Sequence, residues 1–172
     1  AGLGGVQLFA ESLTGLVALT SSNADGTFVL PVSAGQWELS ASEISLGHIG
    51  YLGLDDQNGG IMADTNAAAV TGANINVPKV TALIHGTVAD SGANPLAGIR
   101  LGAGDTGHLY NSDAITDAAG HYVLGVIAGS WDAHISTDSP GLAGYLIPNG
   151  QPVTIAAAQA VDWAPLAVGG KM

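Results

Sequence analysis

The sequence contains no cysteine, and only three of its 172 residues are lysine or arginine. Without cysteine, the chain forms no disulfide and offers no thiolate ligand or thiol nucleophile. Set against 14 aspartates and glutamates, the three cations leave a formal net charge of −11. Nucleic acids and anionic membrane surfaces are bound through clustered lysine and arginine. Because Lys79, Arg100 and Lys171 lie far apart in the sequence, neither class of partner is expected.

Long apolar runs and enzyme motifs are missing as well. No apolar stretch approaches the roughly 18 residues that a membrane-spanning helix requires, so we expect no membrane insertion. The first residues do not have the basic start and apolar stretch of a signal peptide, and an exported protein would therefore be a mature form or an excised piece. The chain has no Gly-x-Ser-x-Gly, His-Glu-x-x-His or phosphate-loop motif. The sequence therefore predicts no catalytic residues and no enzyme.

What the chain does contain is short alternating apolar runs. Hydrophobic residues make up 47% of the sequence and charged residues 10%, a composition that predicts a packed core rather than disorder. The clearest runs predict strands at Phe28–Val32, Trp37–Ala41, His121–Leu124 and Trp131–Ile135. Only two short alanine-rich stretches, 66–69 and 155–158, favour a helical turn. The predicted fold class is all-β, with many short strands arranged as β-sandwiches.

The chain also repeats itself. Residues 23–40 align without a gap on residues 117–134, and the alignment continues to the pair Tyr51 and Tyr145. Equivalent pairs include Gly26 and Gly120, Phe28 and Tyr122, Leu30 and Leu124, Gly35 and Gly129, and Trp37 and Trp131. We call residues 1–79 the first repeat and residues 80–172 the second repeat. The alignment predicts two tandem immunoglobulin-like sandwiches, each with its tryptophan in the core and a hairpin at the second glycine of the pattern.

The second repeat resembles a known family. Its order of segments is Ile84–Asp90, Asn94–Leu101, Thr116–Leu124, Gly129–Trp131 and Gly144 with Tyr145. That order resembles the carboxypeptidase regulatory-like domains, which have a prealbumin-like (transthyretin-like) β-sandwich fold of about seven strands. The resemblance implies a non-catalytic module, commonly attached to secreted or surface bacterial proteins and often found in arrays. It brings no active-site residues with it.

The first repeat departs from this pattern at its start. The second repeat opens with an apolar run at Thr81–Val88, whereas Ala1 already aligns with the position of Asn94 or Pro95. Further along, Val161–Pro165 resembles Ile75–Pro78. We therefore expect the first sandwich to lack its opening strand.

Two explanations of the missing strand remain open. The chain is either a fragment of a longer array, or a strand from a neighbouring molecule fills the gap and joins copies into an assembly. In the second case, we expect the edge that accepts the strand to lie beside Val6, Leu8 and Phe9.

No cofactor is predicted, and calcium is the best metal candidate for a chain this acidic. Oxygen-bearing side chains cluster at Asp55, Asp56 and Asn58, although the spacing does not match a regular calcium-binding loop. His121 and His134 are expected on adjacent strands of one hairpin and facing the same way. We interpret them as exposed sheet residues rather than metal ligands.

Taken together, the sequence predicts an extracellular or cell-surface structural or adhesive module. Its expected partners are copies of itself or neighbouring domains of a longer chain, joined by strand complementation into a surface layer or filament. No Asn-x-Ser/Thr sequon occurs, so any bound glycan would be O-linked. The alternative is a carbohydrate- or peptide-binding accessory module of a secreted hydrolase, which predicts an exposed aromatic cluster.

Overall fold

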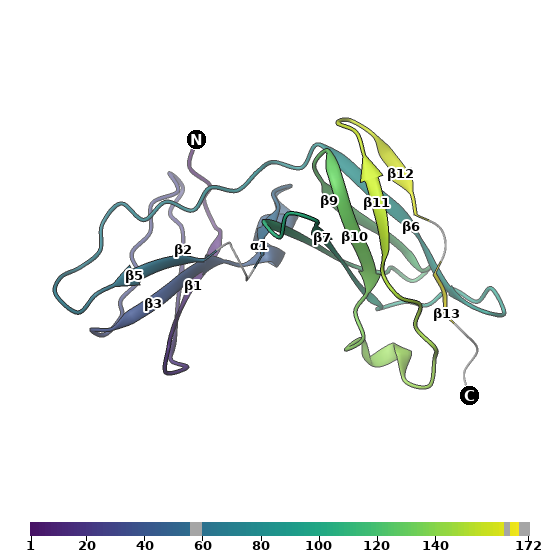
Figure 1. Cartoon of the computed structure of the whole chain (residues 1–172), viewed down its shortest axis with the longest axis horizontal. Coiled ribbons are helices and arrows are strands. Elements are labelled where there is room, and N and C mark those ends of the chain that lie inside the picture. Colours follow the sequence, from purple (N-terminus) through teal and green to yellow (C-terminus); the bar gives the residue numbers. More distant parts are fainter. Residues whose placement is uncertain (56–59, 164–165, 169–172) are drawn as a thin grey trace.

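The computed structural model describes residues 1–55, 60–163 and 166–168. Strands dominate this part of the chain, and the only helices it contains are α1 (Glu43–His48) and a single 3-10 turn, η1 (Pro140–Leu142). The all-β prediction is therefore confirmed. Figure 1 shows two groups of strands side by side along the long axis, with the first repeat in purple to teal and the second in teal through green to yellow. No helix in the described residues is long and apolar enough to cross a membrane.

The first repeat forms one antiparallel sheet. Its strands are β1 (Gln7–Ser12), β2 (Val17–Ser21), β3 (Gln36–Ala41) and β5 (Ile61–Asp64), in the order β2-β1-β3-β5. Alternate residues of the two central strands, β1 and β3, are buried, as expected for a sheet with one covered face. These buried residues are Leu8, Ala10, Trp37, Leu39 and Ala41.

The helix α1 was not predicted from the sequence. Ser42 caps it, because the Ser42 hydroxyl accepts a hydrogen bond from the backbone N–H of Ser45, and Glu43 lies in its first turn. Leu46 is its single buried residue. A six-residue helix with one buried position carries no readable helical periodicity, which is why the pattern did not reveal it.

The second repeat forms two packed layers. One sheet has the order β11-β10-β7-β8-β4, in which β4 comes from the first repeat. In the other sheet β6 is the central strand, with β9 antiparallel on one side and β12 and β13 parallel on the other. The bounds of these second-repeat strands are β6 (Ala82–Asp90), β7 (Arg100–Asp105), β8 (Tyr110–Ile115), β9 (His121–Val126), β10 (Gly129–Ile135), β11 (Gln151–Ile155), β12 (Ala160–Asp162) and β13 (Leu166–Val168). Ile84, Leu124 and Trp131 are fully buried between the layers.

The predicted hairpin between β9 and β10 is wrong. Strand β9 pairs with β6, whereas β10 pairs with β7 and β11 in the opposite sheet. The chain therefore crosses from one layer to the other at Gly129, where φ is 151°. For the same reason His121 and His134 lie on different sheets instead of side by side.

Both repeats fix their layer crossing with the same hydrogen bond. The Trp131 indole donates to the carbonyl of Ile127 at 2.9 Å, and the Trp37 indole donates to the carbonyl of Ser33 at 3.0 Å. Trp131 is 0% exposed and Trp37 is 4% exposed. The two tryptophans thus have matching surroundings, as the sequence alignment predicted.

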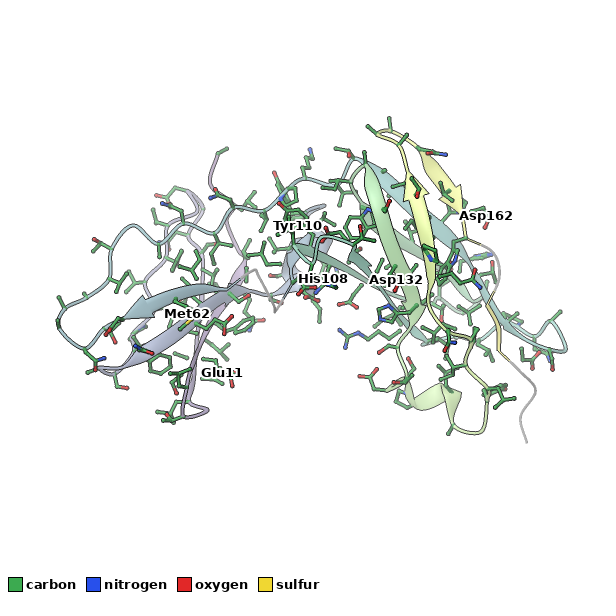
Figure 2. The ribbon with its side chains drawn as sticks, viewed as in Figure 1. Glu11, Met62, His108, Tyr110, Asp132 and Asp162 are labelled. Carbon is green, nitrogen blue, oxygen red and sulfur yellow. The ribbon has the colours of Figure 1, made fainter. Side chains whose placement is uncertain are left out.

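The first repeat also contributes to the second. Strand β4 (Gly53–Leu54) pairs with β8 through Gly53 with Asn111 and Leu54 with Tyr110. Leu52, which is 1% exposed, belongs to the core of the second repeat. Figure 2 shows Tyr110 between the two groups of strands. The domain boundary between residues 79 and 80 stays a prediction. Strand β4 lies before this boundary but belongs to a sheet of the second repeat.

We predict that Leu52→Ala destabilises the second repeat although residue 52 belongs to the first. Truncating a fully buried leucine leaves a cavity, at a cost of about 2–5 kcal/mol. Leu146, the equivalent residue of the second repeat, is 61% exposed, so Leu146→Ala should cost no more than about 0.5 kcal/mol. Urea unfolding measures the loss of stability caused by each substitution, and hydrogen exchange at the amide of Leu124 shows whether the second repeat is affected. Equal effects of the two substitutions would contradict the assignment of Leu52 to this core.

Candidate strand-binding groove

The second layer of the first repeat is incomplete. Residues 27–33 and 73–77 occupy the positions that β9 and β12 hold in the second repeat, but neither segment forms a strand. In the second repeat, β6 lies between these two elements and pairs with both. No described strand takes the place of β6 in the first repeat. The strand predicted at Phe28–Val32 does not form in the described chain, because a strand exists only with a hydrogen-bonded neighbour.

The backbones of both segments are open. No backbone N–H or C=O of residues 28–32 or 73–77 is hydrogen-bonded to another described residue. By contrast, Ile84 is paired with Leu124 on one side and with Val161 on the other. The first repeat thus presents two facing rows of peptide groups whose counterparts in the second repeat are satisfied by β6.

The side chains show the same gap. Phe28, Leu30 and Val32 turn inward and are half-buried, whereas Val29 turns outward and is 79% exposed. The inward counterparts of the second repeat are almost completely covered, at 3% for Tyr122 and 0% for Leu124 and Val126. The opposite segment alternates in the same way, with Ala73, Ile75 and Val77 half-buried. Both segments therefore have an inner face that a missing layer element would cover.

Between the two segments lies an open cavity of about 1110 Å³, which we call the groove. It is larger than the roughly 300–1,000 Å³ that pockets for small molecules usually occupy. Its walls are residues 27–32 and 73–77, and its floor is the inner face of the sheet, with Val6, Leu8, Ala10, Trp37, Leu39 and Ala41. Among the described residues that line it, Asp25 at one end is the only Asp, Glu, Lys or Arg.

A tight turn defines the end of the groove near Asp25. The Asp25 carboxylate accepts hydrogen bonds from the Thr27 hydroxyl at 2.7 Å and from the Thr27 backbone N–H at 3.0 Å. These bonds lower the pKa of the Asp25 carboxyl below its usual value, the hydroxyl bond more than the backbone bond. Gly26 has a φ of 85°, and a Cβ there would lie 2.5 Å from the Cα of Gly2. Glycine is therefore required, and the turn holds the start of the 28–32 wall in place.

The edge predicted beside Val6, Leu8 and Phe9 is not open in the described chain. Strand β1 is paired on both sides, with Leu8 opposite Thr20 of β2 and Ala41 of β3. Val6 and Leu8 are buried in the floor of the groove, and Phe9 points to the outer face. The open peptide groups belong to the other layer.

Figure 2 shows the outer face of the first-repeat sheet. The Glu11 and Met62 side chains lie on the side of the sheet away from the open segments, and both are exposed. Strand β3 places Glu38 between them, because Glu38 pairs with Glu11 and with Met62. The outer face is therefore mixed in character, in contrast to the apolar groove.

The calcium prediction remains a prediction. Asp55 donates its backbone N–H to the carbonyl of Leu109 at 3.0 Å, while Asp56 and Asn58 lie outside the described residues. Within the described ranges, no group of three or more His, Cys, Asp or Glu side chains is arranged to hold a metal ion. His121 and His134 are both exposed, and His121 contacts the Asp117 carboxylate at 3.6 Å.

No protein-family model matches the chain, and no curated protein matches it in sequence. Among solved structures, similar chains include the Bacillus anthracis TIE protein, with 11% identity over 93% of this chain and a TM-score of 0.41. The chain spans 29% of the length of that protein.

Two pilins also resemble the chain. The shaft pilin SpaA from Lactobacillus rhamnosus GG shares 12% identity over 97% of this chain and 88% of its own length, with a TM-score of 0.38. The group B streptococcus pilus 2b backbone protein shares 10% identity over 96% of this chain and 78% of its own, with a TM-score of 0.41.

We predict that hydrogen exchange distinguishes the two repeats at equivalent positions. The amides of Leu30 and Ile75 should exchange at least about 100-fold faster than those of Leu124 and Val161, because only the latter lie in paired strands. Exchange measured by NMR on the full chain at low concentration gives the comparison residue by residue. Similar protection of Leu30 and Leu124 would show that the groove is closed within the chain.

Proposed function

We propose that this chain is a non-catalytic structural module of a cell-surface or secreted assembly, in which a strand from a neighbouring chain completes the first repeat. The observation that carries the proposal is the groove, in which the peptide groups of both walls have no hydrogen-bond partner among the described residues and lie over an apolar floor. An open edge beside half-buried apolar side chains favours association, because an added strand satisfies the backbone and buries those side chains at once.

The chemistry of the groove favours a polypeptide over a small molecule. Two facing rows of peptide groups need hydrogen-bond partners at regular intervals. Only a ligand that repeats donors and acceptors along its length, as a β-strand does, supplies them. Apolar side chains such as Leu30 and Ile75 line both walls. The cavity has a volume of about 1110 Å³, and residues from both ends of the first repeat line it, from Leu3 to Val77.

The carbohydrate-binding alternative finds no support in the described residues. Sugar platforms use exposed aromatic rings, yet Trp37, Trp131 and Trp163 are 4%, 0% and 9% exposed. None of the exposed large apolar side chains in the described part of the chain is aromatic. The peptide-binding form of that alternative would use the same groove, so it differs from our proposal in the source of the peptide.

The family and location are part of the proposal. We infer that each repeat is a prealbumin-like sandwich of the carboxypeptidase regulatory-like type, supported by the segment order of the second repeat and the matching tryptophan bonds. A surface or secreted location follows from that resemblance. Exposed apolar residues on and beside β2 support association with neighbours: Leu13, Leu16, Val17 and Leu19 are 58–78% exposed.

We predict that the full chain self-associates through the groove. Sedimentation velocity over a range of concentrations should show growth of larger species for the wild type, and loss of that growth for Leu30→Asp, which places a charge on the inner wall. Val29→Asp is the matched control, because it adds the same charge on the neighbouring outward side chain, which is 79% exposed. It should associate like the wild type.

The NMR signal of the Trp37 indole N–H checks that both variants keep the first-repeat core. A wild-type chain that stays monomeric at all concentrations would contradict the proposed function, as would equal association of the two variants.

A further inference from the structure

We infer that the groove accepts one strand of defined direction and register, supplied by a neighbouring chain and built on the side-chain pattern of β6. The inference rests on the proposed function and names the partner that it requires. Its basis is internal to the molecule, because the second repeat contains the equivalent groove with its strand in place.

The two walls fix the direction of the strand. In the second repeat, β6 runs antiparallel to β9 and parallel to β12. In β6, Ile84 is paired with Leu124 and with Val161, and the repeat alignment replaces these two partners by Leu30 and Ile75. The strand in the groove therefore runs antiparallel to residues 28–32 and parallel to residues 74–76, and the residue equivalent to Ile84 lies between Leu30 and Ile75.

The hydrogen-bond phase of the antiparallel wall agrees with this register. Val88 donates its backbone N–H to the carbonyl of Gly120, and bonded positions alternate along an antiparallel ladder. Positions 122, 124 and 126 thus turn their peptide groups toward β6, while position 125 turns its N–H away. Pro31, which has no N–H, is the equivalent of residue 125. Because the N–H of this position would point away from the added strand, Pro31 removes no hydrogen bond to that strand. It removes an N–H donor only from the outer side of the wall.

The parallel wall offers two further partners. In the second repeat, Leu83 donates its N–H to the carbonyl of Gln159 at 3.0 Å, and Trp163 donates its N–H to the carbonyl of His85 at 2.8 Å. The equivalent groups of the first repeat are the Ala73 carbonyl and the Val77 N–H. Both belong to the backbone-open segment 73–77, so the added strand is held on both sides.

The side chains that face the floor define the chemistry of the partner. In β6, Ala82, Ile84 and Val88 point inward and are 3%, 0% and 0% exposed, whereas Leu83 is 39% exposed. The partner is therefore an extended segment with small or β-branched apolar residues at alternate positions. Its outward positions are free of this constraint.

One position should differ from β6. A Cβ at Gly86 would lie 2.9 Å from the Tyr122 hydroxyl and 2.7 Å from the Trp163 carbonyl, and that hydroxyl donates to that carbonyl at 2.7 Å. In the first repeat, Phe28 replaces Tyr122 and has no hydroxyl to hold the opposite carbonyl in place. The groove therefore tolerates alanine where β6 requires glycine.

The test uses the full chain and a synthetic peptide with the sequence of residues 80–90. Titration followed by NMR hydrogen exchange should show saturable binding and new protection at the amides of Phe28, Leu30, Val32 and Val77. A peptide with Ile84→Asp should bind at least about 100-fold more weakly, since its carboxylate would be buried unpaired. The matched control Leu83→Asp changes an outward residue and should bind within about threefold of the parent. Equal binding of the two variants would overturn the inference.

Two further arms test the direction and the glycine position. A paramagnetic tag at the peptide N-terminus should broaden signals near Val32, and broadening near Phe28 instead would overturn the direction. The Gly86→Ala peptide should bind within about threefold of the parent, whereas Gly86→Ala in the chain should lower the protection of Tyr122. A large loss of binding by the alanine peptide would overturn the assignment of that position.

The source of the strand is tested by joining the same peptide ahead of Ala1 through a flexible linker. Protection of residues 28–32 by the separate peptide supports donation by a neighbouring chain. Protection only in the linked form would overturn that source in favour of a strand from the same chain, and protection in neither form would overturn the inference entirely. Self-association without peptide binding contradicts the inference alone, while peptide binding by a chain that never self-associates contradicts only the proposed function.

Discussion

The architecture depends on a central strand that is hydrogen-bonded on both sides within one layer. In the second repeat this strand is β6, which satisfies the peptide groups of β9 on one side and of β12 and β13 on the other. Because its inward side chains also cover Trp131 and Leu124, the same strand closes the core. Among the described residues of the first repeat no strand takes this place, so both flanking segments form no ladder and their inner faces stay half-buried.

The opposite sheet of the first repeat forms without such a strand, because its hydrogen bonds are satisfied within that sheet. Strands β1 and β3 pair with each other and with an outer strand on each side, so every central peptide group of that sheet is bonded. The Trp37 indole anchors the crossing to the open layer through the Ser33 carbonyl. Residues 28–32 are thus held at one end by the Asp25 turn and at the other by the tryptophan bond.

Much of this architecture could be predicted from sequence, and the limits have physical causes. The alternating apolar runs and the alignment of Trp37 with Trp131 were enough to predict an all-β chain in which the two tryptophans have matching surroundings. Alternation shows which side chains face inward but not which sheet a strand joins, so the sequence alone could not show that the strand beside Val6, Leu8 and Phe9 is paired on both sides. The pairing of β4 with the second repeat could not be predicted either, because a strand of two residues shows no alternation in the sequence.

The pairing of β4 with a strand of the second repeat has a mechanical consequence. Units connected by a free linker behave as beads on a string, and their relative orientation is set by the linker alone. Here Gly53 and Leu54 join the β8 edge through a backbone ladder, and Asn111 donates to the Glu43 carboxylate at 3.4 Å. Bending the pair at this seam requires breaking those bonds and withdrawing Leu52 from its neighbour's interior, so the seam acts as a stiff joint rather than a hinge.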